Sequence, residues 1–259
     1  MTAIKRSEML VINQKGWDEV APQFYGRTAL PQYGPLAMTE EDLHLIDSLK
    51  EKAVLELGCG SGHTLCYLAK VKEARELWGI DLSRTQIHLA QEYLTQQRVD
   101  AHLFRASMDE NPGIPETHFD LVIAVYSLGW TPDLSHTLSL VNSYLKPGGT
   151  FIFSWEHPFY RCLDYREDVG GYIFTDTYHQ EGATVNSSWK GVEIVQHPRT
   201  LATYLNAVIG SGLILEKIIE SEPNTQLAQD QDYVPDRWYT MPRAQLVPTT
   251  FIIKAHRPS

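Results

Sequence analysis

Three glycines and one carboxylate stand close together early in the chain. Residues 54 to 62 read Val-Leu-Glu-Leu-Gly-Cys-Gly-Ser-Gly, an apolar run that ends in a glycine-rich turn. Gly58, Gly60 and Gly62 permit positive φ and let a ligand approach the backbone closely. Their spacing differs from G-x-G-x-x-G, in which a helix N-terminus meets a pyrophosphate. The turn therefore predicts a binding site for a ligand without phosphates, with Glu56 beside it.

A second carboxylate, Asp81, ends the next predicted strand, residues 76 to 81. An acid at such a strand end can accept hydrogen bonds from both hydroxyls of a ribose, as it does in dinucleotide sites. Asp81 follows Gly58 at close to the roughly 20-residue offset expected of a ribose-binding acid. We therefore favour ligand binding over a merely solvated acid at this position.

Strands and helices alternate from residue 53 onward, which places these motifs in an α/β fold. Short apolar runs are predicted as strands, and a Ser83-x-x-Gln86 capping box starts one of the helices between them. The pattern predicts a doubly wound, mostly parallel, seven-stranded sheet, in which ligands bind beyond the carboxyl ends of the strands. The expected strands cover residues 54–57, 76–81, 101–106, 121–125, 150–155, 213–219 and 248–255.

The other segments are expected to elaborate this sheet. Residues 1–50 are expected to form an N-terminal helical flap over the cofactor pocket or, alternatively, helices that only pack on the sheet. One helix is expected after Thr39 and as far as Leu49, and residues 51–259 form the main domain. Residues 156–198 are dense in aromatic and charged side chains and break the alternation, which predicts an inserted lid. A second polar insertion covers residues 221–247.

The glycine turn resembles motif I of the class I S-adenosylmethionine (SAM) dependent methyltransferases, E/D-x-G-x-G-x-G, with Glu56 in the acidic place. Phe119 to Ser127 resembles the motif IV strand of that family, and Lys146-Pro-Gly-Gly149 resembles its L-K-P-G-G signature. Five features follow one another between residues 54 and 155: the glycine turn, the acid Asp81, the segment 107–109 that binds adenine in the family, the apolar strand and Pro-Gly-Gly. This order is more specific than any single motif. Small-molecule members of this family, methyltransferase domain 11-like, are the nearest type.

The resemblance implies a Rossmann-like methyltransferase fold that binds SAM. Glu56 receives the methionine amine, the turn faces the carboxylate, Asp81 holds the ribose, and Asp109 accepts from the adenine amine. A turn-forming role for Asp109 remains open. The expected cofactor-binding residues are Glu56, Gly58, Cys59, Gly60, Gly62, Asp81, Leu82, Ser107, Met108, Asp109, Ala124 and Tyr126.

The methyl acceptor is less well specified. His157 follows the predicted fifth strand and could act as a general base toward an O, N or C nucleophile, although proximity alone can support the transfer. A hydrogen-bonded structural histidine is the alternative. Side chains expected to line the substrate pocket are Tyr25, Tyr33, Ser127, Trp130, Glu156 and Tyr160.

Composition limits the partners. The chain has 259 residues and a formal net charge of -10, with no basic run, which argues against a nucleic acid and favours a small-molecule substrate. The three cysteines form no Cys-x-x-Cys pair, so a reducing cytoplasmic location is expected. We expect no membrane association and no metal site, because no apolar run is long enough to span a bilayer and the histidines are scattered singly. The oligomeric state is left open.

Three rival functions remain. A nicotinamide-dependent oxidoreductase is disfavoured by the glycine spacing but not by the fold. A catalytically silent SAM-binding protein would keep the same turn. An aminopropyltransferase would also keep the donor site, although the chain shows no extra acidic pair for a polyamine.

Overall fold

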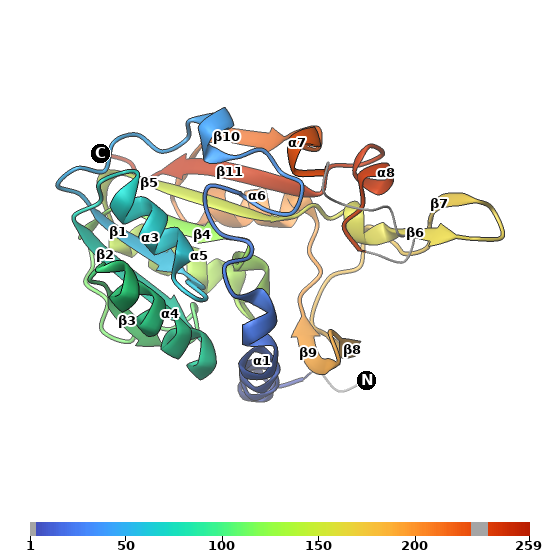
Figure 1. Cartoon of the computed structure of the whole chain (residues 1–259), viewed down its shortest axis with the longest axis horizontal. Coiled ribbons are helices and arrows are strands. Elements are labelled where there is room, and N and C mark those ends of the chain that lie inside the picture. Colours follow the sequence, from blue (N-terminus) through green and yellow to red (C-terminus); the bar gives the residue numbers. More distant parts are fainter. Residues whose placement is uncertain (1–3, 229–237) are drawn as a thin grey trace.

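A seven-stranded sheet forms the centre of the molecule, as predicted from the alternating pattern. The computed structural model describes residues 4–228 and 238–259. The strand order is β10-β11-β5-β4-β1-β2-β3; β1 to β5 run parallel, and β11 pairs antiparallel with both β5 and β10 (Figure 1). The bounds are β1 Ala53–Leu57, β2 Glu76–Asp81, β3 His102–Arg105, β4 Phe119–Val125, β5 Leu145–Glu156, β10 Ile214–Glu220 and β11 Thr250–His256.

Helices cover both faces of this sheet. Leu65 of α3 and Leu94 of α4 pack with Leu121 of β4 on one face, while α5 and α6 cover the other. Because side chains alternate along a strand, Val122 of β4 faces the second layer. The helix bounds are α3 His63–Lys70, α4 Arg84–Gln97, α5 Leu134–Tyr144 and α6 Leu201–Gly210.

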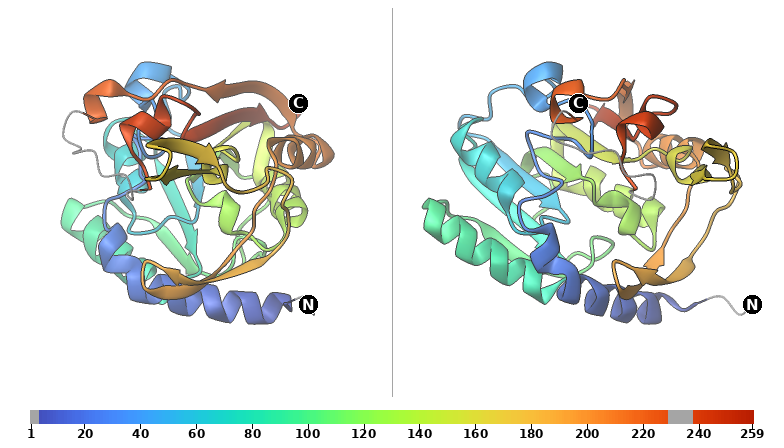
Figure 2. Two further views of the ribbon diagram at one scale, coloured as in Figure 1. Left: turned by 90° about the vertical axis from the view of Figure 1, so that its right-hand side faces the viewer. Right: turned by 45° about the vertical axis from the view of Figure 1, so that its right-hand side comes forward.

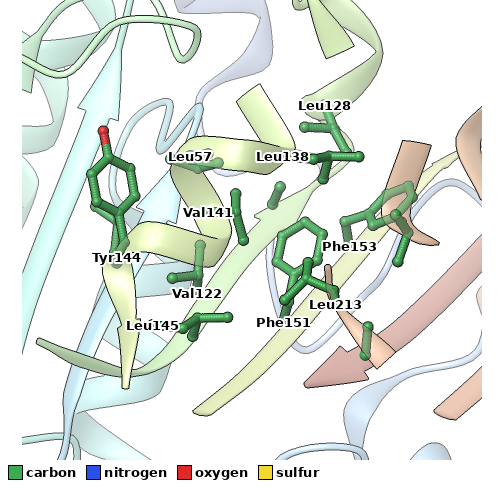
Figure 3. Close-up of a cluster of buried hydrophobic side chains, with 14 of the residues drawn as sticks. Leu57, Val122, Leu128, Leu138, Val141, Tyr144, Leu145, Phe151, Phe153 and Leu213 are labelled. Atoms are coloured by element: carbon green, nitrogen blue, oxygen red, sulfur yellow. The ribbon is translucent and has the colours of Figure 1, made fainter. Parts of the chain in front are cut away.

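The core explains why the central strands are continuous apolar runs. All five residues of β1 are buried, and β4 is buried at every position except Asp120. Figure 3 shows Leu138 and Val141 of α5 against Val122 and Phe151 of the sheet. A parallel strand covered on both sides has no polar face, as the sequence indicated.

Local signals place the helix starts beside the glycine turn. Gly62 is the N-cap of α3 with φ +79°, and a Cβ there would lie 3.2 Å from Leu94. The Ser83 hydroxyl accepts a hydrogen bond from the Gln86 N–H, which caps α4. The turn and the capping side chain therefore fix α3 and α4 at the carboxyl ends of β1 and β2.

The N-terminal region contains α1 Arg6–Val20, the 3-10 helix η1 Ala21–Phe24 and α2 Glu40–Leu43. The prediction that a helix continues from Thr39 to Leu49 is wrong. The chain turns at His44, which is left-handed with φ +48°, and the buried Glu40 carboxylate accepts from the N–H groups of Leu45 and Ile46. Glu40 thus replaces the helical hydrogen bonds that a longer helix would have made.

The predicted lid consists of two hairpins. One pairs β6 Leu163–Arg166 with β7 Gly171–Phe174 and projects from the body in Figure 1; the other pairs β8 Thr184–Trp189 with β9 Val192–Gln196. The second hairpin lies against α1 in both views of Figure 2. The second insertion contains α7 Thr225–Ala228 and α8 Met241–Ala244, and its residues 229–237 lie outside the described residues.

Candidate active site

One pocket lies at the carboxyl ends of β1, β2 and β4, where the sequence placed its motifs. It encloses about 900 Å³ of empty space, including open solvent at its mouth. The glycine turn and the strand ends form its floor, while α1 and η1 contribute the opposite wall through Asn13, Trp17 and Phe24. The site is therefore a cleft between the sheet edge and the N-terminal segment.

The turn leaves room for a ligand at one glycine in particular. Gly60 has φ +50°, and a Cβ built on it would meet only the Gln86 Oε1 atom, at 3.9 Å. A Cβ on Gly58 would instead lie 2.4 Å from Ser127, so Gly58 permits close packing of β1 against the end of β4. Gly60 is the position where a side chain would enter the ligand space.

Two buried acceptor atoms of the pocket have no hydrogen-bond partner among the described residues: Glu56 Oε2 and Gln86 Oε1. Glu56 is 2% exposed, and burial raises the pKa of its carboxyl well above the usual value. A buried acceptor without a donor is unfavourable in an isolated protein. The pair therefore fits a ligand that brings N–H or O–H donors, and a cationic amine would suit Glu56 best.

Asp81 is held in place by backbone groups. Its Oδ2 accepts from the Gly60 N–H at 2.9 Å and its Oδ1 from the Ser83 N–H at 2.9 Å, while burial raises its pKa to about 6. These two bonds link the end of β2 to the glycine turn and to the start of α4. A carboxylate oxygen can accept more than one hydrogen bond, so Asp81, which lines the pocket, can also accept from a diol.

A family model for a methyltransferase domain matches residues 54–149, which span the glycine turn, Asp81 and the Pro-Gly-Gly segment. The crystal structure of a SAM-dependent methyltransferase from Mesorhizobium loti superposes with a TM-score of 0.66, at 27% identity, over 83% of this chain and 95% of that one. Residues 54–149 form a methyltransferase domain, and the chain shares the fold of a SAM-dependent methyltransferase.

Two curated relatives extend the comparison of this methyltransferase. An uncharacterized protein of Haemophilus influenzae is 29% identical over 191 residues, 69% of this chain and 73% of that protein. A malonyl-[acyl-carrier protein] O-methyltransferase of Priestia megaterium is 32% identical over 105 residues, 40% of this chain and 37% of that enzyme. The chain thus spans well under half the length of the Priestia megaterium enzyme.

Most of the predicted cofactor residues come together in the pocket of the methyltransferase, and so do two of the predicted substrate residues. This set contains Glu56, Gly58, Cys59, Gly60, Asp81, Leu82, Ser107, Met108, Tyr126, Ser127 and Trp130. Gly62 and Ala124 lie outside it, because Gly62 faces α4 and Ala124 is fully buried in the core.

Asp109 also lies outside the pocket lining. Arg6 of α1 binds both of its oxygens, Nε to Oδ2 at 2.7 Å and Nη2 to Oδ1 at 2.8 Å, and the Ser107 hydroxyl donates to Oδ1. Burial raises the pKa of the Asp109 carboxyl, but these hydrogen bonds outweigh burial and hold the pKa below its usual value. In this structure Asp109 anchors α1, so the geometry does not support the expected adenine contact.

His157 does not line the pocket, and the geometry does not support its expected role as a base. Its ring is 3% exposed; Nδ1 accepts from the Phe159 N–H at 3.2 Å, and Nε2 lies 2.7 Å from Glu220 Oε1. Burial lowers the pKa of His157, so the neutral ring carries its proton on Nε2 and donates to Glu220. The ring faces β10, and the structural alternative describes it better.

Four more predicted substrate residues lie elsewhere. Tyr33 is fully buried and donates to Glu40, and Tyr25 packs edge-on against His63 on the outside of the turn. The Tyr160 hydroxyl donates to the Trp238 carbonyl. The Glu156 carboxylate accepts from Trp238 Nε1 at 2.6 Å and from the Tyr239 hydroxyl at 2.8 Å. These side chains support the walls beneath and beside the pocket.

Several pocket residues were not among the predicted site residues. Asn13, Trp17 and Phe24 come from the region predicted as a helical flap, and Arg27 follows it on a loop. Trp17 and Phe24 were visible as an apolar helical stripe, which is typical of packing, and only the position of α1 over the sheet edge turns that stripe toward the pocket.

No group of three or more His, Cys, Asp or Glu side chains that could hold a metal ion occurs in residues 4–228 and 238–259. Over the same ranges, none of the helices has the length and apolarity required to cross a bilayer. Cys59, Cys66 and Cys162 are buried and free.

Proposed function

We propose that this methyltransferase transfers a methyl group from SAM to an oxygen, nitrogen or carbon atom of a small molecule. SAM, when bound, supplies a methyl group activated by the positive charge on its sulfur. The observation that carries the proposal is the buried, partnerless Oε2 of Glu56 beside the open space at Gly60.

We assign donor binding to the residues that line the cleft. Glu56 receives the amine, and the backbone N–H groups of the turn and the exposed cation of Arg27 are available to a carboxylate. The Asp81 carboxylate accepts from the ribose hydroxyls. Ser107 and Met108, after β3, flank the adenine.

The protein accelerates the transfer mainly by holding donor and acceptor together. The reaction is an in-line displacement, so correct placement accounts for much of the rate enhancement and no base is strictly required. Trp17, Trp130 and Tyr126 line the part of the pocket nearest the end of β4. There they exclude water from the acceptor, and an acidic proton released by that acceptor passes to solvent.

A small-molecule acceptor is supported by the charge of the protein. The chain carries a net charge of -10, which disfavours nucleic acid. Three free buried cysteines support a reducing compartment, the cytoplasm.

Calorimetric titration with S-adenosylhomocysteine and with NADH tests the donor assignment. We expect heat from the first ligand and none from the second, whereas binding of NADH alone would support the oxidoreductase alternative. Incubation with methyl-labelled SAM and a broad panel of small molecules then tests catalysis. Labelled product supports the proposal, while an intact donor site with no turnover across the panel would favour a silent SAM-binding protein.

A further inference from the structure

Six aromatic side chains form one continuous wall from the sheet edge to the lid. We call them the aromatic wall. They come from α1 and η1, from the ends of β4 and β5, and from β8 of the second hairpin. The members are Trp17, Phe24, Tyr126, Trp130, Trp155 and Trp189.

Ring contacts connect every member of the wall. Tyr126 lies 5.2 Å from Trp155 between ring centroids, and Trp155 lies 5.6 Å from Trp130. Trp130 contacts Trp17 at 5.3 Å and Trp189 at 5.4 Å. The rings of Phe24 and Trp189 are parallel to within 15°, with centroids 5.6 Å apart. Edge-on and stacked contacts of this kind hold the rings in fixed orientations.

The wall is not part of the closed core. Phe119, Phe151, Phe153 and Phe251 of the sheet are fully buried, whereas all six wall residues keep part of their surface accessible. Four of the six, Trp17, Phe24, Tyr126 and Trp130, line the same pocket as Glu56 and Gly60. Large apolar rings that remain partly exposed inside a pocket are surfaces for a ligand.

Two cations lie near the wall. Arg27, three residues after Phe24, lines the same pocket, and the Arg199 guanidinium donates to the carbonyls of Gly129 and Thr131, on either side of Trp130. In the part of the chain that the structure describes, no Lys or Arg stacks on the six rings themselves. The wall therefore selects the shape of a ligand and not its charge.

We infer that the methyl acceptor is a planar aromatic molecule that stacks on the members of this wall that line the pocket. The inference rests on the proposed function and specifies its substrate class. Planarity follows from the flat ring faces. Trp189 of the lid does not line the pocket; its ring packs on Trp17, Phe24 and Trp130 and holds them in position.

The inference is tested on the full-length protein saturated with S-adenosylhomocysteine, whose own binding is measured first. Calorimetry then compares 2-naphthol with decahydro-2-naphthol, and phenol with cyclohexanol. Each pair shares its carbon skeleton and hydroxyl but differs in planarity. We expect each planar compound to bind about tenfold more tightly than its saturated partner.

Variants locate the binding surface. Trp189→Leu keeps an apolar side chain but removes the ring, and we expect it to weaken 2-naphthol binding about tenfold while the affinity for S-adenosylhomocysteine stays within about twofold. Trp189→Phe retains a ring face and should restore most of the affinity. Trp78→Leu, in β2 beside Phe104, removes a tryptophan outside the wall and should leave 2-naphthol affinity unchanged.

The outcomes separate the two proposals. If S-adenosylhomocysteine binds but saturated compounds bind as well as planar ones, or none of the planar compounds binds, the aromatic-acceptor inference is overturned and the donor assignment stands. Equal affinity of wild type and Trp189→Leu for 2-naphthol also overturns it. Failure of S-adenosylhomocysteine to bind overturns the proposed function, on which the inference rests.

Discussion

The side chain of Asn13 on α1 pairs with the backbone of Val195 on β9. Asn13 Nδ2 donates to the Val195 carbonyl at 3.1 Å, and the Val195 N–H donates to Asn13 Oδ1 at 2.7 Å. Asn13 is buried, and a Cβ on Gly16 one turn later would lie 2.7 Å from the Glu193 carbonyl oxygen. The Asn13 side chain therefore joins the β8–β9 hairpin to α1, the helix that lines the pocket.

Removal of the Asn13 amide should weaken the contact between α1 and the β8–β9 hairpin. Asn13→Ala leaves a buried N–H and a buried carbonyl of Val195 without their partner, so we expect the free energy of unfolding in urea to fall by about 1–3 kcal/mol. Limited proteolysis within the β8–β9 hairpin should become faster. Asn206→Ala on the exposed surface of α6 should change stability by less than about 0.5 kcal/mol. Equal stability of the two variants would contradict the docking role of Asn13.

Arg6 pairs with Asp109, whose side chain is 1% exposed. Arg6→Met removes this partner and leaves the Asp109 carboxylate buried without its counter-charge. We expect a loss of about 1–2 kcal/mol at pH 7, below the range for fully buried pairs because Arg6 itself is 44% exposed. Arg75→Met breaks an exposed pair with Glu51 and should cost below about 0.5 kcal/mol.

The pH dependence of this loss has a defined sign. The folded pKa of Asp109 is lowered from 3.8, so the pair stabilises the protein above that pH and loses its effect as pH falls through the folded pKa. The difference in unfolding free energy between wild type and Arg6→Met should therefore shrink below about pH 4. A difference that persists in acid would indicate that Arg6 acts by packing alone.

His157→Gln distinguishes a structural histidine from a catalytic one. The variant loses the part-buried hydrogen bond with Glu220, so we expect the unfolding free energy to fall by about 0.5–1.5 kcal/mol. Turnover per folded molecule should stay within about twofold, because the ring does not reach the pocket. His88→Gln, at an exposed pair with Glu92, serves as the control. A kcat at least tenfold lower at unchanged stability would restore the base role.

Affinity for S-adenosylhomocysteine should fall as pH decreases from 7.5 to 5. Burial raises the pKa of Asp81 to about 6 and raises that of Glu56, and the ligand binds the ionised carboxylates. Protons therefore compete with the ligand, by up to about tenfold per pH unit below the pKa of each group. Calorimetry at several pH values measures this decrease in affinity, and Asp81→Asn should make the affinity depend less steeply on pH. Affinity that is constant or higher at pH 5 would contradict the assigned roles.

Local sequence signals predicted the sheet and the floor of the pocket well. The apolar run at residues 54–57, the glycine turn and the cap at Ser83 each specify structure within a few residues, and β1, α3 and α4 start where these signals place them. Helix length after Thr39 was not predictable in the same way. There a buried carboxylate, Glu40, ends the helix through tertiary contacts with Tyr33 and Lys72.

The side chains around the pocket were harder to predict because their direction depends on distant partners. His157 follows a strand that ends at the site, yet it turns toward Glu220 on β10, 63 positions later. Asp109 is in the expected segment but meets Arg6, 103 positions earlier. Trp17 and Trp189 meet only after the lid folds back on α1. Such contacts between remote segments leave no periodic signal in the sequence.

The central claim is that the open space at Gly60 receives the sulfonium nucleoside. Calorimetric titration of S-adenosylhomocysteine into wild type, Gly60→Val and Gly113→Val tests it most directly, with circular dichroism to verify folding. Gly113 also has positive φ, +110°, and a Cβ there meets nothing within 4 Å, so this variant carries backbone strain away from the site. Wild type and Gly113→Val should bind the ligand, and folded Gly60→Val should not. Undiminished affinity in Gly60→Val, or no heat with wild type, would contradict it.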